Sequence, residues 1–252
     1  LVFGVPAPFA VGTGLTLIMG SSIINTLKHR HLGNVDFKLG LILVSGTIPA
    51  LFLAEWLINT LESAGLAGPV IRYVYIVVLA ALGLFIVYDY LRTLRAPVAR
   101  VGEITTASLA RRVQSLEIPP HWISIPGYRR VSTYVSLPGS GIDRISVFIL
   151  FAVGFGAGLF AGMLGAGGGT ILMPILIFVL GVPTTVAIGT DLFQIIITGS
   201  VGTFIKSFAD HVDPVMVVIM LTAASLGSQL GTAATRFVEA SRIRIFFGVT
   251  IL

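Results

Sequence analysis

The chain has 252 residues, of which 55% are hydrophobic and only 11% are charged, and its mean hydropathy is +0.98. Because a soluble domain carries about 25% charged residues, this composition excludes an ordinary water-soluble fold and indicates a membrane protein. The absence of cysteine excludes disulfides and thiolate metal sites. The net charge of +5 does not indicate nucleic acid here, since excess Lys and Arg in a membrane protein mark its cytoplasmic loops.

Apolar segments long enough to cross a membrane as helices, about 20 residues each, follow one another along the chain. The predicted spans are residues 9–27, 38–58, 71–91, 145–163, 184–205 and 214–235. A further apolar piece at 170–181 is too short to span, since it would measure only about 18 Å as a helix. The chain starts without Met and ends inside another apolar run, so we expect a piece trimmed at both ends.

An internal repeat relates the two halves of the chain at a constant offset in sequence, which places Gly4 on Gly181. "GVPAPFAVGTGL" at 4–15 aligns with "GVPTTVAIGTDL" at 181–192, and the same offset places Asp36 on Asp213. Small residues recur at every fourth position in three apolar segments. These are Gly46, Ala50 and Ala54, then Ala223, Gly227 and Gly231, and finally Gly154, Gly158 and Gly162. Such stripes let helix backbones approach closely in lipid, so they predict a compact bundle.

Basic loops indicate how the repeats cross the membrane, because short cytoplasmic loops are enriched in Lys and Arg. The basic connections are residues 28–38, 92–144 and 236–244. They share one face only if 145–181 crosses an even number of times, which makes the repeats inverted. We therefore expect an all-α polytopic membrane protein of two inverted repeats with glycine-broken or re-entrant helices. Its parts are a first repeat at 1–91 lacking its N-terminal part, a basic cytoplasmic connection at 92–144, and a truncated second repeat at 145–252.

The stretch "GMLGAGGGTILMP" at 162–174 predicts a break between two helical pieces. The break is expected at Gly165, Gly167, Gly168 and Gly169. Bare backbone at membrane depth is tolerated where it faces protein or a water-filled cavity, and a helix N-terminus there favours an anion. A simple tight turn is the alternative. No Lys-Ser/Thr follows the glycines, as a nucleotide-binding loop requires.

Polar residues also stand near the start of the apolar run at 184–205, where Thr190, Asp191 and Gln194 occur. Polar groups at that depth tend to face partners or a path. At the equivalent place the first repeat has Gly12, Thr13 and Gly14. Two alternatives are open: the threonines bond to their own helices, and Asp191 is an N-cap. Glu55 and Asp89 lie near predicted helix ends, and we interpret them as interfacial.

These motifs, together with "HLGNVDFKLGL" at 31–41, resemble those of the sulfite exporter TauE/SafE family of membrane transporters. The resemblance covers nearly the whole chain except the central connection, and it implies a carrier for sulfite, sulfoacetate or another small organic anion. It places glycine-motif roles on Gly165, Gly167, Gly168 and Gly169, and Gly-Thr roles on Gly12, Thr13, Gly189 and Thr190. Gly14 and Asp191 stand where the family usually has a small hydroxyl residue.

Inverted repeats with broken helices commonly bind a transported substrate at their interface. We therefore predict a multi-pass transporter of the prokaryotic plasma membrane that moves a small anion by alternating access, with proton coupling at Asp191. The predicted substrate-binding residues are Gly12, Thr13, Gly14, Gly165, Gly167, Gly168, Gly169, Gly189, Thr190 and Gln194. A passive anion channel is the main alternative, and a scaffold or sensor is another. We expect no enzyme activity, cofactor or metal; whether the chain forms a homo-oligomer is left open.

Overall fold

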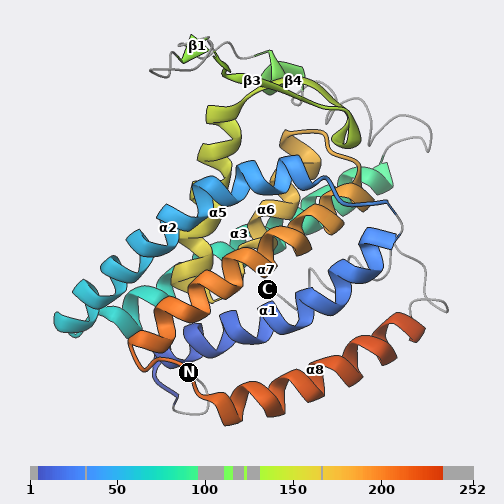
Figure 1. Cartoon of the computed structure of the whole chain (residues 1–252). Coiled ribbons are helices and arrows are strands. Elements are labelled where there is room, and N and C mark those ends of the chain that lie inside the picture. The colour runs from blue at the N-terminus through green and yellow to red at the C-terminus, as the bar shows by residue number, and fades with distance from the viewer. Residues whose placement is uncertain are drawn as a thin grey trace.

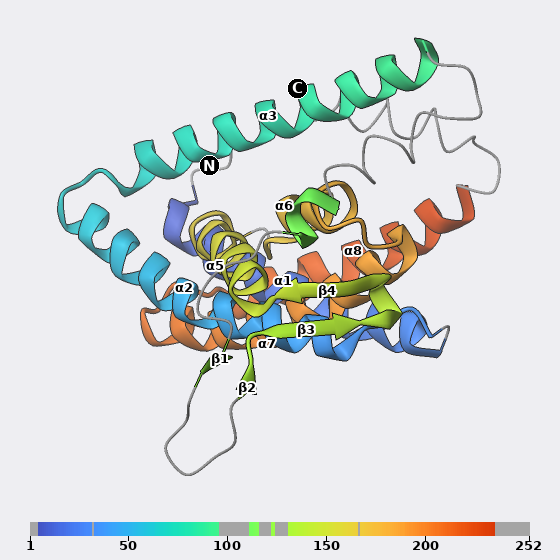
Figure 2. The same ribbon diagram turned by 90° about the horizontal axis from the view of Figure 1, so that it is seen from above.

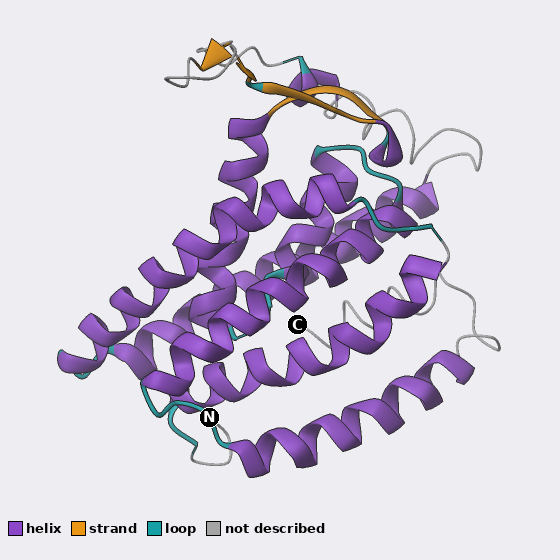
Figure 3. Ribbon diagram, viewed as in Figure 1, coloured by secondary structure: helices purple, strands orange, loops and turns teal. Residues whose placement is uncertain are grey.

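The computed structural model describes residues 5–31, 33–95, 111–115, 122–123, 131–165 and 167–234. Within these ranges the protein is a helical bundle with a small β-hairpin at one end (Figures 1 and 3). Four helices are long and apolar enough to cross a membrane. They are α1 (Ala7–His31), α2 (Phe37–Ser63), α5 (Val147–Leu164) and α7 (Thr184–Phe208). The predicted all-α membrane fold is confirmed.

Two further helices coincide with the other predicted spans. They are α3 (Ala67–Arg95) and α8 (Pro214–Ala234), in which shorter apolar stretches occur at Ala67–Ala81 and Pro214–Gly227. Seen from above, α3 lies along one side of the bundle (Figure 2). The predicted loop at 236–244 and most of the connection at 92–144 lie outside the described residues.

The small-residue stripes of α2 and α5 pack against each other, in keeping with the compact bundle that such stripes predict. A Cβ built on Gly46 would overlap the Phe151 carbonyl, and one on Gly154 would overlap the Leu43 carbonyl. Farther along, a Cβ on Gly162 would lie 2.5 Å from the Cβ of Ala54. Because each glycine admits the backbone or small side chain of the other helix, α2 and α5 lie side by side at close range.

The two repeats exchange equivalent contacts. The Thr13 hydroxyl oxygen accepts a hydrogen bond from the Asp213 N–H (3.2 Å), and the Thr190 hydroxyl oxygen accepts one from the Asp36 N–H (2.9 Å). The repeat offset converts one contact into the other, which is the pattern of a two-fold related pair. The glycines one position earlier show the same equivalence. A Cβ built on Gly12 would overlap the His211 carbonyl, and one built on Gly189 would overlap the Asn34 carbonyl.

These contacts define the directions of the helices. The beginning of α1 meets the loop that follows α7, and the beginning of α7 meets the loop that follows α1, so α1 and α7 run antiparallel. On its other side α1 packs against α8, where Gly20 lies next to Leu221 and the two helices run in the same direction (Figure 1). Antiparallel equivalent helices support inverted repeats, whose orientation in the membrane stays a prediction.

Part of the central connection is built into the fold. Strands β3 (Tyr134–Leu137) and β4 (Ile142–Ser146) form an antiparallel hairpin through a short 3₁₀ turn, η1 (Pro138–Ser140). Its Leu137, Ile142 and Ile145 are fully buried in one core cluster with side chains of α2 and α5 and of the residues after the glycine turn. A second pair of short strands, β1 (Trp122–Ile123) and β2 (Val131–Ser132), precedes it. Residues 134–146 are therefore packed against the helices of the bundle.

Candidate functional site

The predicted break at the glycines is confirmed. Helix α5 ends at Leu164, and Gly165, Gly167 and Gly168 have φ angles of +69°, +68° and +74°. Residues that carry a side chain rarely adopt this left-handed backbone conformation, so the turn requires glycine at these positions. After the turn the chain resumes as α6 (Gly169–Pro174), followed by a π-helical turn, η2 (Ile175–Val179). We call residues 165–169 the glycine turn.

Equivalent positions of the two repeats contact the glycine turn. A Cβ built on Gly14 of α1 would lie 2.8 Å from the Gly165 carbonyl oxygen, and one on Gly169 would lie 2.5 Å from Oδ2 of Asp191 of α7. Gly14 and Asp191 correspond to each other in the internal repeat. The turn therefore lies between α1 and α7 at positions that the repeat relates.

The Gly-Thr steps directly precede Gly14 and Asp191 in the chain. Thr13 and Thr190 are buried at opposite ends of the α1/α7 pair, where each accepts the hydrogen bond from the other repeat's loop described above. Among the described hydrogen bonds, neither hydroxyl bonds to its own helix. The structure thus places Gly14, the glycine turn and Asp191 in contact, whereas the hydroxyls of Thr13 and Thr190, one residue away in each helix, bond to the loops at Asp213 and Asp36. Binding roles for all these residues stay predictions.

Asp191 lies inside α7, which begins at Thr184, so the alternative that it caps a helix is wrong. Its carboxyl group is buried, and Oδ1 has no hydrogen-bond partner among the residues described. Gln194, one turn later, donates from Nε2 to the hydroxyls of Thr47 (3.1 Å) and Thr198 (2.7 Å). Its Oε1 is also buried without a partner in the described part of the chain. Two acceptor atoms in the interior are therefore free for a ligand, a proton or water.

These groups belong to one face of α7. Asp191, Gln194, Thr198, Gly202 and Lys206 recur every three or four residues and are all buried. Residues at this spacing lie on the same side of a helix, so together they form a stripe about 22 Å long. We call it the polar face of α7. It begins beside the glycine turn and ends at a lysine.

Lys206 and Glu55 are charged residues that the bundle buries. The predicted span at 184–205 stops before Lys206, but Lys206 lies in the last turn of α7 with 2% of its surface exposed; Glu55, interpreted as interfacial, is packed between helices and is only 9% exposed. The Lys206 ammonium and the Glu55 carboxylate form a direct ion pair. Removing one partner of such a buried pair typically costs about 3 to 5 kcal/mol, because the other charge is left uncompensated. The spacing of Lys206 from Asp191, Gln194 and Thr198 is the sequence signal that could have placed it in the interior.

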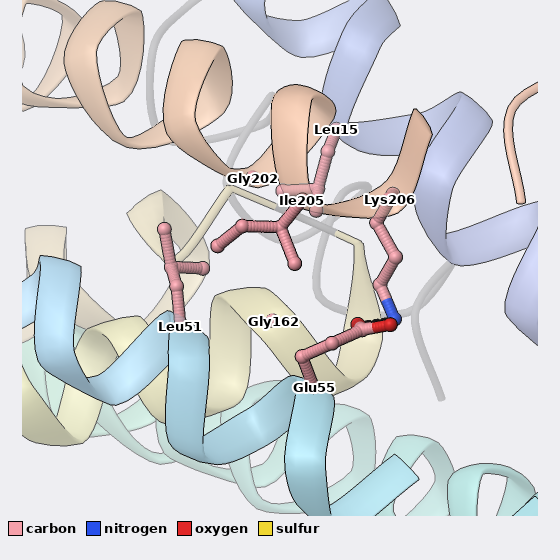
Figure 4. A pocket seen from close by; sticks show the side chains of 7 residues that line it. All are labelled: Leu15, Leu51, Glu55, Gly162, Gly202, Ile205 and Lys206. Carbon is pink, nitrogen blue, oxygen red and sulfur yellow. Dashed lines mark ion pairs between the residues drawn. The ribbon is translucent and has the colours of Figure 1, made fainter. Parts of the chain in front are cut away.

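A narrow pocket surrounds this ion pair. Figure 4 shows Glu55 of α2 and Lys206 of α7 meeting at its edge. The remaining lining residues are Leu15, Leu51, Gly162, Gly202 and Ile205. The pocket has room for about one water molecule. Because Gly162 lies three residues before Gly165, the pocket adjoins the glycine turn.

The fold and this interior define a polytopic membrane protein that buries charged and polar groups between its helices. The family model for "Sulfite exporter TauE/SafE" matches residues 1–252, so the chain belongs to this family of membrane transporters, which is not a family of enzymes. A curated relative, "Probable membrane transporter protein YunE" of Bacillus subtilis (strain 168), is 22% identical over 243 residues, covering 96% of this chain and 77% of the relative. No solved structure matches. The chain is a multi-pass membrane transporter, and its bacterial relative supports the plasma membrane as its location.

Proposed function

We propose that this protein is a secondary transporter that moves a small anion, such as sulfite, sulfoacetate or another organosulfonate, by alternating access coupled to protons. The observation that carries this proposal is the exchanged pair of contacts, Thr13 with Asp213 and Thr190 with Asp36. They join the repeats at the two ends of the α1/α7 pair. A transporter that opens its ends in turn needs a matching contact to release at each end, and related repeats supply one.

The state described here holds both contacts, so we assign it to a conformation in which both ends are closed. Opening toward one side releases the contact at that end while the other persists. Because the contacts are equivalent, the two open states differ little in the bonds that they lose. A small free-energy difference between states is what lets a substrate or proton shift their populations.

Two features support a small anion as the substrate. The family model is described as that of a sulfite exporter. In addition, the buried Lys206 supplies a cation in the interior. An ammonium group binds an oxyanion through charge-assisted hydrogen bonds.

Flux into proteoliposomes tests the proposal. The purified protein is reconstituted, and uptake of sulfite, sulfoacetate and methanesulfonate is followed with and without an imposed proton gradient. We expect the gradient to drive accumulation of at least one of these anions above its external concentration. Protein-free liposomes are the control. Flux that only equilibrates the anion would indicate the passive channel, and absence of flux for all three would overturn the proposed substrate class.

A further inference from the structure

The ion pair of Lys206 and Glu55 is not fully satisfied. The ammonium group can donate three hydrogen bonds, and Glu55 is its ion-pair partner among the residues described. The second carboxylate oxygen of Glu55, Oε1, is buried and has no hydrogen-bond partner in the same part of the structure. Lys206 is therefore able to bind another acceptor; the pocket beside it holds about one water molecule in this state, so an anion enters as the surrounding helices move apart.

A graded row of charged side chains leads toward this pair from one end of the bundle. Glu62, two turns after Glu55 on α2, has a side chain that is 48% exposed, and its Oε2 lies 3.7 Å from Nε2 of His211. The His211 side chain is 12% exposed, and its backbone N–H donates to the Lys206 carbonyl (3.0 Å). Exposure thus falls from Glu62 through His211 to Lys206. Glu62 and His211 lie at the end of the bundle that also holds Asp213. Asp36 and the β3/β4 hairpin lie at the opposite end.

We propose that Lys206 binds the transported anion and that Glu55 is the internal counter-ion that this anion displaces, taking up one proton as it leaves the lysine. The inference rests on the proposed function, because it assigns substrate binding and coupling within the same interior. Before binding, the ammonium faces a carboxylate; afterwards it faces the anion, and Glu55 is a neutral carboxylic acid. One anion and one proton enter together, so the net charge of the pocket is unchanged.

The physical reason for the coupling is the cost of an unpaired buried charge. A carboxylate that loses its ammonium partner inside the bundle is left as an unpaired charge away from bulk water, which is costly. Protonation removes that charge. The anion then supplies the negative charge that Lys206 requires, so binding of anion and proton favour each other.

Among the described residues around the pocket, Lys206 and Glu55 are the pair that can bind the anion and take up the proton. Helix α5, packed along α2, has no ionisable side chain, and α1 contributes Leu15 to the pocket. Helix α3 contributes Tyr75, whose hydroxyl donates to the Leu164 carbonyl. The remaining ionisable neighbours among the described residues are His211 and Glu62. Among the described residues that face the pocket, Lys206 is thus the cation for which an anion and Glu55 compete.

The test compares the wild type with Glu55→Gln, which is neutral at every pH and close in shape to the protonated acid. Methanesulfonate is the main probe, since its charge does not change with pH, and sulfite is the second. In the wild type, the half-saturating concentration should rise by about tenfold per pH unit once Glu55 is ionised, as one linked proton requires. Glu55→Gln should bind at least as tightly as the wild type and lose this pH dependence, and a proton gradient should no longer drive accumulation.

Matched variants keep the test decisive. Asp210→Asn removes an exposed carboxylate from the same end of the bundle and should retain the wild-type pH dependence. Lys206→Met should lose anion binding; the double variant Glu55→Gln/Lys206→Met, in which neither charge is left unpaired, should fold and still not bind. If the wild type moves the anion and Glu55→Gln keeps the same pH dependence, this inference is overturned while the proposed function stands. If the wild type moves none of the anions, the proposed function itself fails.

Discussion

The hydroxyl oxygen of Thr190 accepts a hydrogen bond of 2.9 Å from the backbone N–H of Asp36, a residue of the other repeat. Asp36 is the N-cap of α2, and its Oδ1 accepts from the N–H groups of Lys38 and Leu39. Its Oδ2 accepts from the hydroxyl of Ser140 in the β3/β4 hairpin (2.7 Å). Asp36 therefore joins the start of α2, the first turns of α7 and the hairpin at one end of the bundle.

Replacing Thr190 by valine should remove the acceptor for the Asp36 N–H. A fully buried donor left without a partner costs about 1 to 3 kcal/mol; because this contact is partly buried, the free energy of unfolding should fall by about 1 kcal/mol, while Thr190→Ser should stay close to the wild type. Thermal unfolding in detergent measures this effect. The sequence hypothesis that the Gly-Thr step binds substrate further predicts weaker anion binding by Thr190→Val. Normal affinity and flux in this variant would remove the step from the site.

Gly189→Ala should separate the loop at Asn34 from α7, because the added Cβ would overlap the Asn34 carbonyl. We expect a loss of stability of about 1 to 3 kcal/mol, in the usual range for overpacking, together with reduced flux. Gly156→Ala is the matched control, since a Cβ at Gly156 meets no atom within 4 Å. That change should be neutral or stabilising by up to about 1 kcal/mol. Equal stability of the two variants would contradict the close contact.

Asp191→Asn separates the two candidates for proton coupling. Asp191 is the residue predicted from the sequence, whereas the ion pair points to Glu55. If Glu55 carries the proton, Asp191→Asn should keep the pH dependence of anion binding. Its stability should not fall, because a neutral amide replaces a buried carboxyl group whose Oδ1 has no partner among the described residues. Flux and half-saturation measured across pH check both points, and loss of the pH dependence would return coupling to Asp191.

Cysteine labelling tests the inverted topology in this cysteine-free background. The basic loops predict that cysteines at Lys28, Arg111 and Glu239 react with an impermeant reagent from the cytoplasmic side. A cysteine at Asp210, in the loop that meets the beginning of α1, should react from the other side. The parallel direction of α1 and α8 supports the placement of Glu239. Labelling of Glu239 together with Asp210 would rule out the inverted arrangement.

Charge reversal of Arg111 and Arg112 should weaken binding of anionic lipid. Both side chains are exposed on a helical turn that the structure attaches to the bundle, where Gln114 donates to the Leu180 carbonyl (3.0 Å). Each basic residue near a membrane surface contributes about 1 kcal/mol of attraction to anionic lipid. Binding of spin-labelled phosphatidylglycerol by the reconstituted protein measures the change. Reversal at the exposed Arg72 of α3 is the control, and equal effects would argue against a lipid-facing role for the connection.

Several features followed from the sequence because they depend on neighbouring residues. The length of each apolar block predicted the helices, and the glycines at 165–169 predicted the break because only glycine adopts positive φ freely. Small residues at every fourth position marked the faces on which α2 and α5 meet. The constant repeat offset identified α1 with α7 and α2 with α8. Each of these inferences required only spacing along one segment or the comparison of two segments.

Only the tertiary structure decided which polar groups meet. Glu55 and Lys206 are far apart in the sequence, and whether their side chains face lipid, water or each other depends on how α2 and α7 rotate and cross. The threonines similarly contact the loops of the opposite repeat, which the repeat offset alone does not reveal. Periodicity along one helix determines which residues share a face. Packing between helices determines what that face contacts, because a contact requires two surfaces and a single chain segment specifies only one.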